Sequence, residues 1–343
     1  MLPSEGFVPH SLQPLHTFAL SSQCQNFVEI TDSAQLKSQC FKVPFCLLGE
    51  GSNTIFLNDY AGTVIKMATQ GITITERSHD FLVSVAAGEN WHQLVTYLLE
   101  QGIAGFENLA LIPGTVGAAP VQNIGAYGVE IAQFIEAVDY FDIDSGSFKS
   151  LTNQQCHFAY RESVFKHALK NKAVITQVHF KLSKIWQPVL SYGPLQQLKN
   201  PTPQQVCAQV IQTRNSKLPN PYKLANAGSF FKNPIITNSE LAQLITTYPE
   251  VPHYPHGAGH HKVAAGWLIE QAGLKGYKIA GIEVHQQQAL VLVNHGNSTG
   301  DDLINMIAHI QDIVLTRYNI SLEHEVRLID QDNECHISLE QSV

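Results

Sequence analysis

The chain has 343 residues, of which 44% are hydrophobic and 15% are charged, and its formal net charge is −8. This length predicts about two or three domains, and the hydrophobic content excludes a largely disordered chain. A nucleic-acid scaffold is disfavoured because it would present a basic surface. The first 20 residues lack a basic run followed by an apolar core, so a secretory signal is not expected. No apolar run approaches the length of a membrane span.

The first half of the chain is predicted to consist of short strands and turns, because its apolar segments are β-branched or alternate with polar residues. One helix is expected over Asn90–Gln101, with an apolar face and Gly102 as its C-cap. The expected strands are Phe45–Leu48, Thr54–Leu57, Thr63–Met67, Ile72–Thr75, Phe81–Ala86, Val138–Asp142 and Ala173–Leu182.

The composition changes after residue 185. Prolines punctuate Gln187–Tyr222, where one helix is expected over Pro203–Ser216, so this stretch is predicted to connect two domains. Strands dominate early and mix with helices late, which favours α+β domains over a single parallel sheet. The later expected elements are helices over Ser239–Thr247, Ala264–Ala272 and Asp301–Tyr318 and strands over Ala289–Val293 and Val326–Ile329.

A glycine-containing turn, Gly49–Asn53, follows the first apolar strand. It lacks the third glycine of a dinucleotide-binding fingerprint, since Thr54 occupies that position, and a strand rather than a helix is expected next. We therefore reject a Rossmann site. Consecutive backbone N–H groups in such a turn can still bind an anion. A plain hairpin turn remains the alternative.

A second glycine-rich stretch, Leu111–Gly128, holds several glycines and alanines. Small residues at this density let the backbone approach a phosphate or a planar ring closely. A purely structural turn remains the alternative, and the absence of a Gly-Lys-Ser/Thr sequence excludes a Walker nucleotide site.

Three polar residues outside these loops are candidates for chemistry. Arg161 could bind a carboxylate or phosphate with two hydrogen bonds, or it could be a surface residue on a turn. Ser229, within Asn226–Pro234, could donate a proton from a partly dry pocket, or it could cap a turn. Glu323 and Glu325 would face the same side of a strand, either towards a site or at a solvated edge.

A metal site is disfavoured. The densest histidine cluster, His253, His256, His260 and His261, lies among prolines and glycines that predict a flexible loop instead of a rigid set of ligands. The six cysteines include no Cys-x-x-Cys pair, so reduced thiols are expected.

Taken together, these segments resemble the UDP-N-acetylenolpyruvoylglucosamine reductase (MurB) family, in its form with a tyrosine-bearing lid loop. The resemblance extends through nearly the whole chain, and several matching segments are long and irregular. The matching segments are Leu48–Asn53, Pro113–Ala118, Gln122–Gly128, Tyr160–Phe165, Arg214–Pro219, Asn226–Pro234, Ala264–Ile269 and Glu323–Val326.

The resemblance implies an α+β flavoprotein of three domains. Two would bind FAD in a vanillyl-alcohol-oxidase-like (PCMH-type) fold, and a third α+β domain would bind the substrate. The implied boundaries are 1–70 with 320–343 for the first FAD-binding domain, 71–215 for the second, and 216–319 for the substrate domain. FAD is the implied cofactor and NADPH the hydride donor. We expect a cytoplasmic monomer that binds no metal, nucleic acid or membrane.

The implied reaction belongs to peptidoglycan precursor synthesis. NADPH reduces FAD, and hydride then passes to C3 of the enolpyruvyl ether, which yields UDP-N-acetylmuramate. By resemblance, Ser229 protonates C2, while Arg161 and Glu325 stabilise the enolate, Arg161 as a charge clamp and Glu325 as a protonated donor or orienting acid.

The resemblance also assigns binding residues. The implied cofactor-binding residues are Gly49, Gly51, Ser52, Asn53, Pro113, Gly114, Thr115, Gly117, Ala118, Asn123, Ile124 and Gly125. The implied substrate-binding residues are Tyr192 in the lid segment Ser191–Pro194, Arg214, Lys217, Asn233, Tyr254 and Gln288, although three successive glutamines leave the register of Gln288 open.

Two alternative functions are disfavoured by the residues present. An FAD-dependent oxidase on the same scaffold often tethers its flavin through a loop His or Cys, and Pro113–Gly128 contains neither. A non-catalytic nucleotide-sugar-binding protein should have lost Arg161, Ser229 or Glu325, and all three are present. The reductase is therefore the leading hypothesis.

Overall fold

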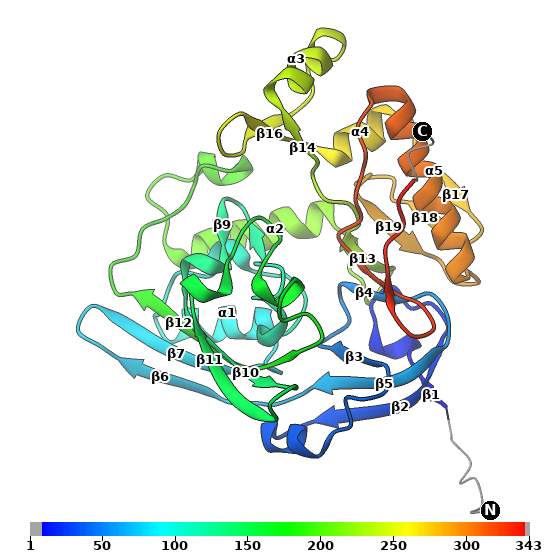
Figure 1. Ribbon diagram of the computed structural model, residues 1–343. Coiled ribbons are helices and arrows are strands. Elements are labelled where there is room, and N and C mark those ends of the chain that lie inside the picture. The colour runs from blue at the N-terminus through cyan, green and yellow to red at the C-terminus, as the bar shows by residue number, and fades with distance from the viewer. Residues whose placement is uncertain (1–8, 340–343) are drawn as a thin grey trace, which may run out of the picture. The chain divides into compact units, whose positions relative to one another are not determined.

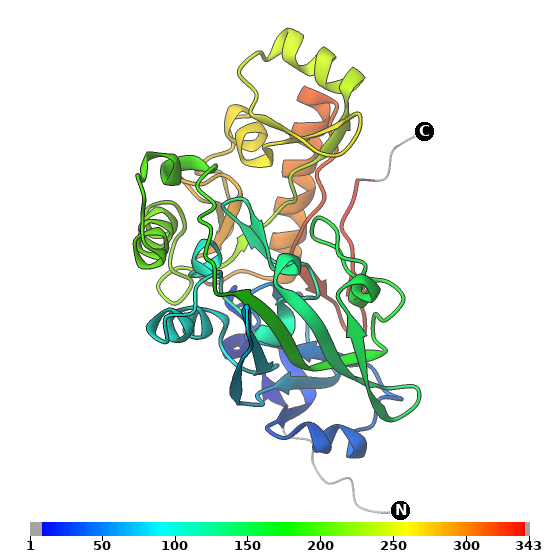
Figure 2. The same ribbon diagram turned by 90° about the vertical axis from the view of Figure 1, so that its left-hand side faces the viewer.

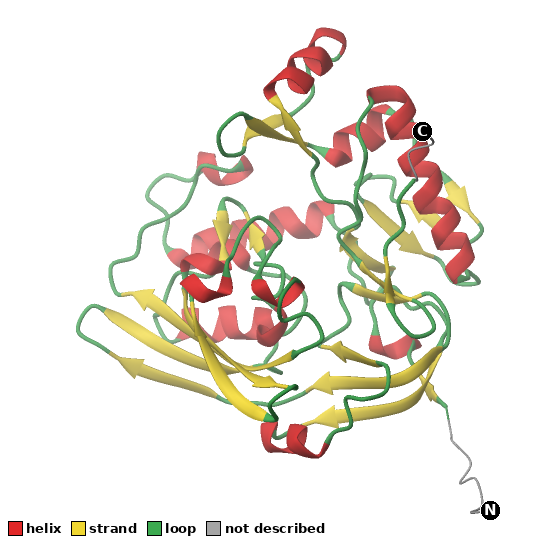
Figure 3. Cartoon of the chain, viewed as in Figure 1, coloured by secondary structure: helices red, strands yellow, loops and turns green. Residues whose placement is uncertain are grey.

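A computed structural model describes residues 9–339, which divide into two compact units (Figure 1). Unit 1 comprises residues up to 26, residues 51–62 and the chain from 217 onwards; unit 2 comprises residues 27–50 and 63–216. Both units mix helices with strands (Figure 3), as the sequence predicted. The boundary at 216 lies inside the connector expected over Gln187–Tyr222. The division into three domains stays a prediction.

Unit 2 is built on a five-stranded antiparallel sheet (Figures 1 and 2). Its strands, in spatial order, are β11 (Ser147–Thr152), β10 (Ile135–Asp142), β12 (Ala173–Ser183), β7 (Asp80–Ala86) and β6 (Ile72–Glu76). β3 (Phe45–Leu48) pairs in parallel with β5 (Tyr60–Met67), and β8 (Gly125–Ala126) forms a hairpin with β9 (Val129–Glu130).

Two helices and an aromatic cluster complete unit 2. Helix α1 (Trp91–Glu100) begins at Asn90, whose side chain accepts the Gln93 N–H at 2.9 Å, and α2 spans Pro203–Lys217. The ring of Trp91 packs 5.0 Å from that of Phe106, which lies 5.1 Å from Phe180. All three rings are buried, so the helix is held against the sheet by a dry core. Short 3₁₀ helices lie at Ser33–Ser38, Glu107–Leu109, Val116–Ala118, Ile131–Gln133, Gln154–Cys156, Val164–Lys166 and Gly193–Gln197.

Unit 1 contains several small sheets. The largest has the order β13 (Ala225–Ser229), β19 (Val291–Asn294), β18 (Ile282–Val284) and β17 (Lys278–Ile279). A second has the order β14 (Ile235–Thr237), β16 (His260–Val263) and β15 (His253–Pro255). A third joins distant parts of the chain, because β4 (Thr54–Phe56) pairs in parallel with β20 (Arg327–Ile329), which also pairs with β21 (Glu334–Cys335).

Helices cover the sheets of unit 1. Helix α5 (Gly300–Tyr318) lies against β17 and β18 (Figure 1), while α3 (Asn238–Thr247) and α4 (Ala265–Gln271) are shorter. Thr299 caps α5 by accepting the Asp302 N–H at 3.2 Å. The inner face of α5 is fully buried, which anchors this helix in the apolar core of the unit. Near the start of the chain, β1 (His10–Ser11) pairs with β2 (Gln23–Ile30), and Gln13–Leu15 forms a 3₁₀ turn.

Most of the expected elements are confirmed, with three differences. The strand expected from Ala289 begins at Val291, because Ala289 and Leu290 form a turn. Gly102 lies one residue beyond the C-cap, Gln101, and has a φ of +74°. The sequence did not predict a further set of strands, most of which are two to five residues long or lack a clear alternation: β1, β2, β8, β9, β11, β13–β18 and β21.

Candidate cofactor and active site

The turn Gly49–Asn53 connects β3 to β4. Because a strand and not a helix follows the turn, the structure agrees with the exclusion of a Rossmann dinucleotide-binding site. Gly51 is buried and has a φ of +66°. Within residues 9–339, no group accepts the backbone N–H of Glu50, Gly51 or Ser52. Successive unpaired N–H groups around a residue with positive φ form an anion-binding nest. This turn therefore fits a diphosphate such as that of FAD.

Glu50 fastens this turn to the second glycine-rich loop. Its Oε2 accepts the Gly114 N–H at 3.0 Å, and its Oε1 accepts a hydrogen bond from the Asn90 side chain. A Cβ added to Gly49 would lie 2.6 Å from Thr115 Oγ1, so the two loops touch there. Glu50 is not among the site residues predicted from the sequence, although it is the single carboxylate of the turn.

The loop Pro113–Ala118 is bound to the residue that follows β7. The Gly117 N–H donates to Ala87 O at 2.8 Å, and a Cβ on Gly117 would lie only 2.6 Å from the Ala87 Cβ. Thr115 is buried, whereas Pro113 and Ala118 are exposed. Position 117 thus requires glycine because a side chain would collide with protein atoms. This is the structural role that the sequence analysis gave as the alternative to contact with a ligand.

Asn123 links the second loop to the turn that carries Arg161. It is fully buried, and its side-chain nitrogen donates to Glu130 Oε2 at 2.9 Å and to Ala159 O at 3.0 Å, while its oxygen accepts the Ala132 N–H at 3.0 Å. Its side chain is therefore occupied by protein groups. Cofactor contact at this position stays a prediction, as it does at the neighbouring Ile124, which is buried.

Arg161 lies against the hairpin that begins at Gly125. Its Nη2 donates to Gly125 O at 3.1 Å, and a Cβ on Gly125 would lie 3.4 Å from its Nη1. The backbone of Arg161 is left-handed, with a φ of +58°, and its carbonyl accepts the Lys166 ammonium at 2.9 Å. These hydrogen bonds hold Arg161 in a fixed position at a tight turn. An arginine that only faces solvent would need no such contacts.

A second arginine of unit 2, Arg214 on α2, is half-buried, and its Nε is buried without a hydrogen-bond partner within residues 9–339. Burial lowers the pKa of Arg214; nearby Tyr127 opposes this effect and Arg161 reinforces it. The ring of Tyr127 also meets the exposed Tyr192 edge-on at 6.0 Å. Two neighbouring guanidinium groups favour an anionic ligand.

Ser229 is placed by a β-bulge. Asn226 pairs with Val293 and Ser229 with Val291, so β13 carries one extra residue. Gly228 takes a φ of +73°, and its N–H donates to the Asn226 side chain at 3.0 Å. Ser229 is exposed, and no group within residues 9–339 hydrogen-bonds its hydroxyl. The bulge therefore presents a free hydroxyl.

Glu325 lies beside Ser229 in unit 1. The Glu325 N–H donates to Phe230 O at 2.8 Å, and the Asn53 side chain donates to Glu325 O at 3.3 Å. Glu323 and Glu325 do not lie on a strand, because the structure forms only an isolated bridge there, between Phe231 and His324. Glu323 is exposed and pairs with Lys232 at 2.7 Å, so only Glu325 remains a candidate for the site.

The N-terminus of α4 gathers two of the predicted substrate residues. Asn233 Oδ1 accepts the Ala265 N–H at 3.0 Å, and Gln288 Oε1 lies 3.3 Å from the position of a Cβ on Gly266. Tyr254 is exposed on β15, where it pairs with Lys262. Lys217 is exposed at the end of α2.

The histidine cluster was expected on a flexible loop, and this was wrong. His253 lies on β15 and both His260 and His261 on β16, which pair with each other in an antiparallel hairpin, and His256 lies in its turn. Pro255 is tolerated because β15 is an edge strand. Within residues 9–339, no three His, Cys, Asp or Glu side chains are grouped as metal ligands.

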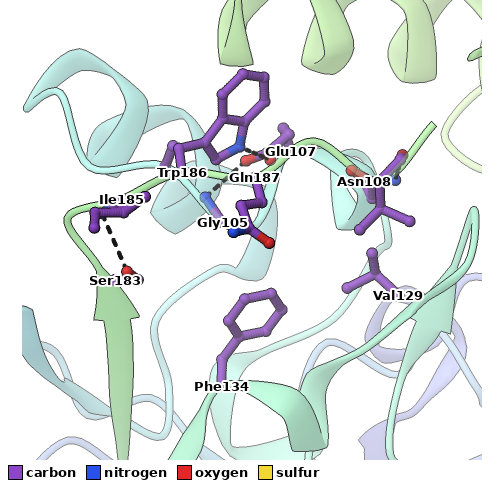
Figure 4. A pocket seen from close by; sticks show the side chains of 11 residues that line it. Gly105, Glu107, Asn108, Val129, Phe134, Ser183, Ile185, Trp186 and Gln187 are labelled. Carbon is purple, nitrogen blue, oxygen red and sulfur yellow. Dashed lines mark hydrogen bonds between the residues drawn. The ribbon is translucent and has the colours of Figure 1, made fainter. Parts of the chain in front are cut away.

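A cavity of about 450 Å³ lies elsewhere in unit 2 (Figure 4). Glu107 is buried there and accepts the Trp186 indole N–H at 2.5 Å and the Gly105 N–H at 2.7 Å. None of the predicted site residues lines this cavity. Within residues 9–339, no helix is long and apolar enough to cross a membrane.

Comparisons with known proteins agree with this geometry. Residues 33–152 match a model of an FAD binding domain, and residues 220–329 match a model described as the C-terminal domain of UDP-N-acetylenolpyruvoylglucosamine reductase. The chain that carries this turn and the exposed Ser229 is an FAD-dependent oxidoreductase with an α+β fold.

Relatives define the family. The chain is 73% identical to the UDP-N-acetylenolpyruvoylglucosamine reductase of Pseudoalteromonas translucida, over 96% of this chain and 98% of that protein. It is 48% identical to the reductase of the same name from Pasteurella multocida, over 94% of this chain and 97% of that protein. The chain belongs to the UDP-N-acetylenolpyruvoylglucosamine reductase family.

A solved structure shows the same fold. The crystal structure of UDP-N-acetylenolpyruvylglucosamine reductase (MurB) from Thermus caldophilus superimposes with a TM-score of 0.64 and 22% sequence identity. The match covers 94% of this chain and 100% of that chain. It confirms the expected fold class.

Proposed function

We propose that this protein reduces UDP-N-acetylenolpyruvoylglucosamine to UDP-N-acetylmuramate, with FAD as cofactor and NADPH as hydride donor. The observation that carries the proposal is the junction of Ser229 and Glu325, where one backbone hydrogen bond joins Glu325 to the residue after Ser229, in a chain that belongs to this reductase family. The reaction serves peptidoglycan precursor synthesis.

The residues present fit FAD. The N–H groups of Glu50, Gly51 and Ser52 would hold its diphosphate, and the loop Pro113–Ala118 with Asn123–Gly125 would line its remaining surface. When bound, FAD supplies the hydride that reaches C3 of the enolpyruvyl group.

Ser229 and Glu325 have distinct tasks in this proposal. Hydride arrival at C3 leaves negative charge on C2, delocalised into the substrate carboxylate. The Ser229 hydroxyl gives its proton to C2, which completes the lactyl ether. A serine can do so because the enolate is a strong base at that instant. Glu325 acts as a protonated donor or orienting acid towards the same group.

Arginines balance the negative charge of the substrate. Arg161 acts as a charge clamp on the enolate. Arg214, with its buried and unpaired Nε, Lys217, Asn233 and Gln288 are proposed to bind the UDP moiety. Tyr192 and Tyr254 are both exposed, as residues that close over a bound ligand must be before it arrives.

Three properties complete the proposal. We infer a cytoplasmic protein, because the proposed reaction belongs to the cytoplasmic synthesis of peptidoglycan precursors. We infer a monomer, because the sequence marks no assembly interface. The net charge of −8 supports a protein that binds neither nucleic acid nor an anionic membrane.

The experiment that tests the function uses the purified protein. We expect a yellow solution whose flavin absorbance bleaches with NADPH and returns on addition of UDP-N-acetylenolpyruvoylglucosamine, with UDP-N-acetylmuramate as the product. Bleaching without recovery on this substrate would contradict the proposed activity. A colourless protein that gains no absorbance on incubation with FAD would contradict the cofactor.

A further inference from the structure

His324 lies directly between Glu323 and Glu325, and it is buried, with 6% of its surface exposed. Its Nδ1 lies 2.7 Å from Val326 O, and its Nε2 lies 3.1 Å from the Ile337 nitrogen. No motif of the sequence analysis singled it out. Its two ring nitrogens connect the Glu325 segment to the chain beyond β21.

The hydrogen bonds define which nitrogen carries the proton. The carbonyl oxygen of Val326 only accepts, so Nδ1 must donate; the backbone N–H of Ile337 only donates, so Nε2 must accept. Both bonds exist together only in the neutral ring with its proton on Nδ1. The ring is therefore fixed in charge, tautomer and orientation.

The bond from Nδ1 spans Glu325. It runs from the side chain of residue 324 to the carbonyl of residue 326 and so closes a turn around residue 325. The Glu325 backbone is also bound on both sides, through its N–H to Phe230 O and through its carbonyl to the Asn53 side chain. Each contact restricts the backbone from which the Glu325 carboxyl projects.

We propose that His324 is a positioning residue, which through its Nδ1 hydrogen bond to Val326 sets the backbone that aims the Glu325 carboxyl at the substrate. The inference rests on the proposed role of Glu325. His324 itself contacts no reacting atom in this scheme; it acts through the turn it closes.

Protonation of the ring should weaken this arrangement. Burial lowers the pKa of His324; the bond to Val326 O and exposed Glu323 oppose this effect, while His336 and Lys232 reinforce it. The rings of His324 and His336 lie 4.3 Å apart, and Glu323 is paired with Lys232. An imidazolium would point a second N–H at the Ile337 N–H. The arrangement is thus fully present above the ordinary histidine pKa and is lost as the pH falls through the lowered one.

Two variants separate the two nitrogens. In His324→Asn the amide nitrogen can replace Nδ1 and keep the bond to Val326 O. In His324→Gln the amide oxygen reaches towards the position of Nε2 and can accept from Ile337, but the bond around Glu325 is lost. His336→Asn is the matched control, because it removes a neighbouring imidazole that makes neither bond.

The readouts are the two half-reactions of the flavin-loaded protein, measured by stopped flow at pH 7.5 and at the lower pH at which NMR of wild type shows the His324 ring to be protonated. We expect reduction by NADPH to stay within about twofold of wild type in all variants. Reoxidation by the UDP-sugar should fall roughly tenfold in His324→Gln and stay near wild type in His324→Asn and His336→Asn. His324→Asn should also lose the acid sensitivity of wild-type reoxidation, because it has no group to protonate.

Three outcomes would contradict the positioning role of His324. Equal reoxidation rates in both His324 variants, or equal losses in both half-reactions, would show a merely structural histidine and overturn the inference. If a variant does not fold with flavin, the wild-type pH profile against His336→Asn still decides, provided it extends down to the pH at which NMR shows the His324 ring to be protonated. Reoxidation that does not fall as His324 takes up its proton overturns the inference. A wild-type protein that never reoxidises with this substrate refutes the proposed function first, and the inference with it.

Discussion

The glycine loops of unit 2 and the Ser229–Glu325 junction of unit 1 both carry predicted site residues, but they are built in opposite ways. In the loops, Gly49, Gly117 and Gly125 lie so close to other protein atoms that a Cβ would come within 3.0 Å of them. At the junction, the Ser229 hydroxyl has no described partner and the backbone alone fixes its place. Substitutions in the loops should therefore affect binding and packing, whereas those at the junction should affect chemistry alone.

The largest effect is expected from a side chain in the loops. In Gly125→Val, the Cβ would lie 2.9 Å from Val129 O, and the branched side chain would press on Arg161. We expect the variant to purify colourless or with substoichiometric flavin while circular dichroism shows a folded protein. Gly125→Ala should retain intermediate flavin. Full flavin occupancy in the valine variant would mean that this loop is only a turn.

Ser229→Ala tests the Ser229–Glu325 junction of unit 1. It removes a hydroxyl that bonds to no described group, so flavin binding and stability should be unchanged. Reduction by NADPH should be normal, and reoxidation by the enolpyruvyl substrate should slow by at least ~10²-fold, the usual scale for a positioned acid. Substrate affinity should change little, because the lost contact belongs to the transition state. Equal slowing of both half-reactions would assign Ser229 a structural role.

Glu50→Gln tests whether the carboxylate that joins the two glycine loops is needed for flavin binding. The amide offers one acceptor where Asn90 and the Gly114 N–H both donate, which leaves one donor unmatched at a cost of about 1–3 kcal/mol. We expect flavin to dissociate about tenfold more readily or more, as followed by fluorescence during dilution. Glu89→Gln is the control, since the Glu89 side chain accepts the Gly71 N–H at 2.7 Å, outside the loop, and Glu89 binds the loop through its backbone carbonyl, which accepts the Val116 N–H at 2.8 Å and is unchanged by the substitution. The same flavin loss in both variants would rule out a specific role for Glu50.

The smallest effect concerns backbone strain away from the site. Ala19 has a φ of +55°, a conformation that costs a residue with a Cβ about 1–2 kcal/mol. Ala19→Gly relieves this strain but adds freedom to the unfolded chain, so we expect a gain of up to about 1 kcal/mol in the free energy of unfolding. Ala242→Gly, in exposed helix α3, should instead lose about 1 kcal/mol. Thermal unfolding of both variants checks the two signs.

Local pattern was enough to predict part of this molecule. β3, β12 and α5 carry apolar runs or periodicity in their own residues, so they were found without knowledge of their neighbours. The identity of Ser229, Arg161 and Glu325 as candidates came from motifs, and the structure brings Ser229 and Glu325 together within unit 1. Their roles stay predictions.

The remainder depends on partners far along the chain. The bulge that presents Ser229 exists only against β19, more than 60 residues later. The prolines and glycines around the histidines at 253–261 predict a loop, because they mask strands that form only on pairing. Glu50 and His324 act through contacts that no spacing encodes. Sequence patterns indicate which local conformation a residue favours by itself. These four features instead depend on contacts with residues elsewhere in the fold.

The parallel pairing of β4 with β20 also constrains how the protein is made. Asn53, at the head of β4, binds the backbone of Glu325, 272 residues later. A ribosome adds about 5–20 residues per second, so tens of seconds separate the synthesis of these two partners. During that time β4 emerges without its neighbour, and an unpaired strand edge invites association with other chains. Newly made chains should thus need protection until the last residues of β20 leave the ribosome.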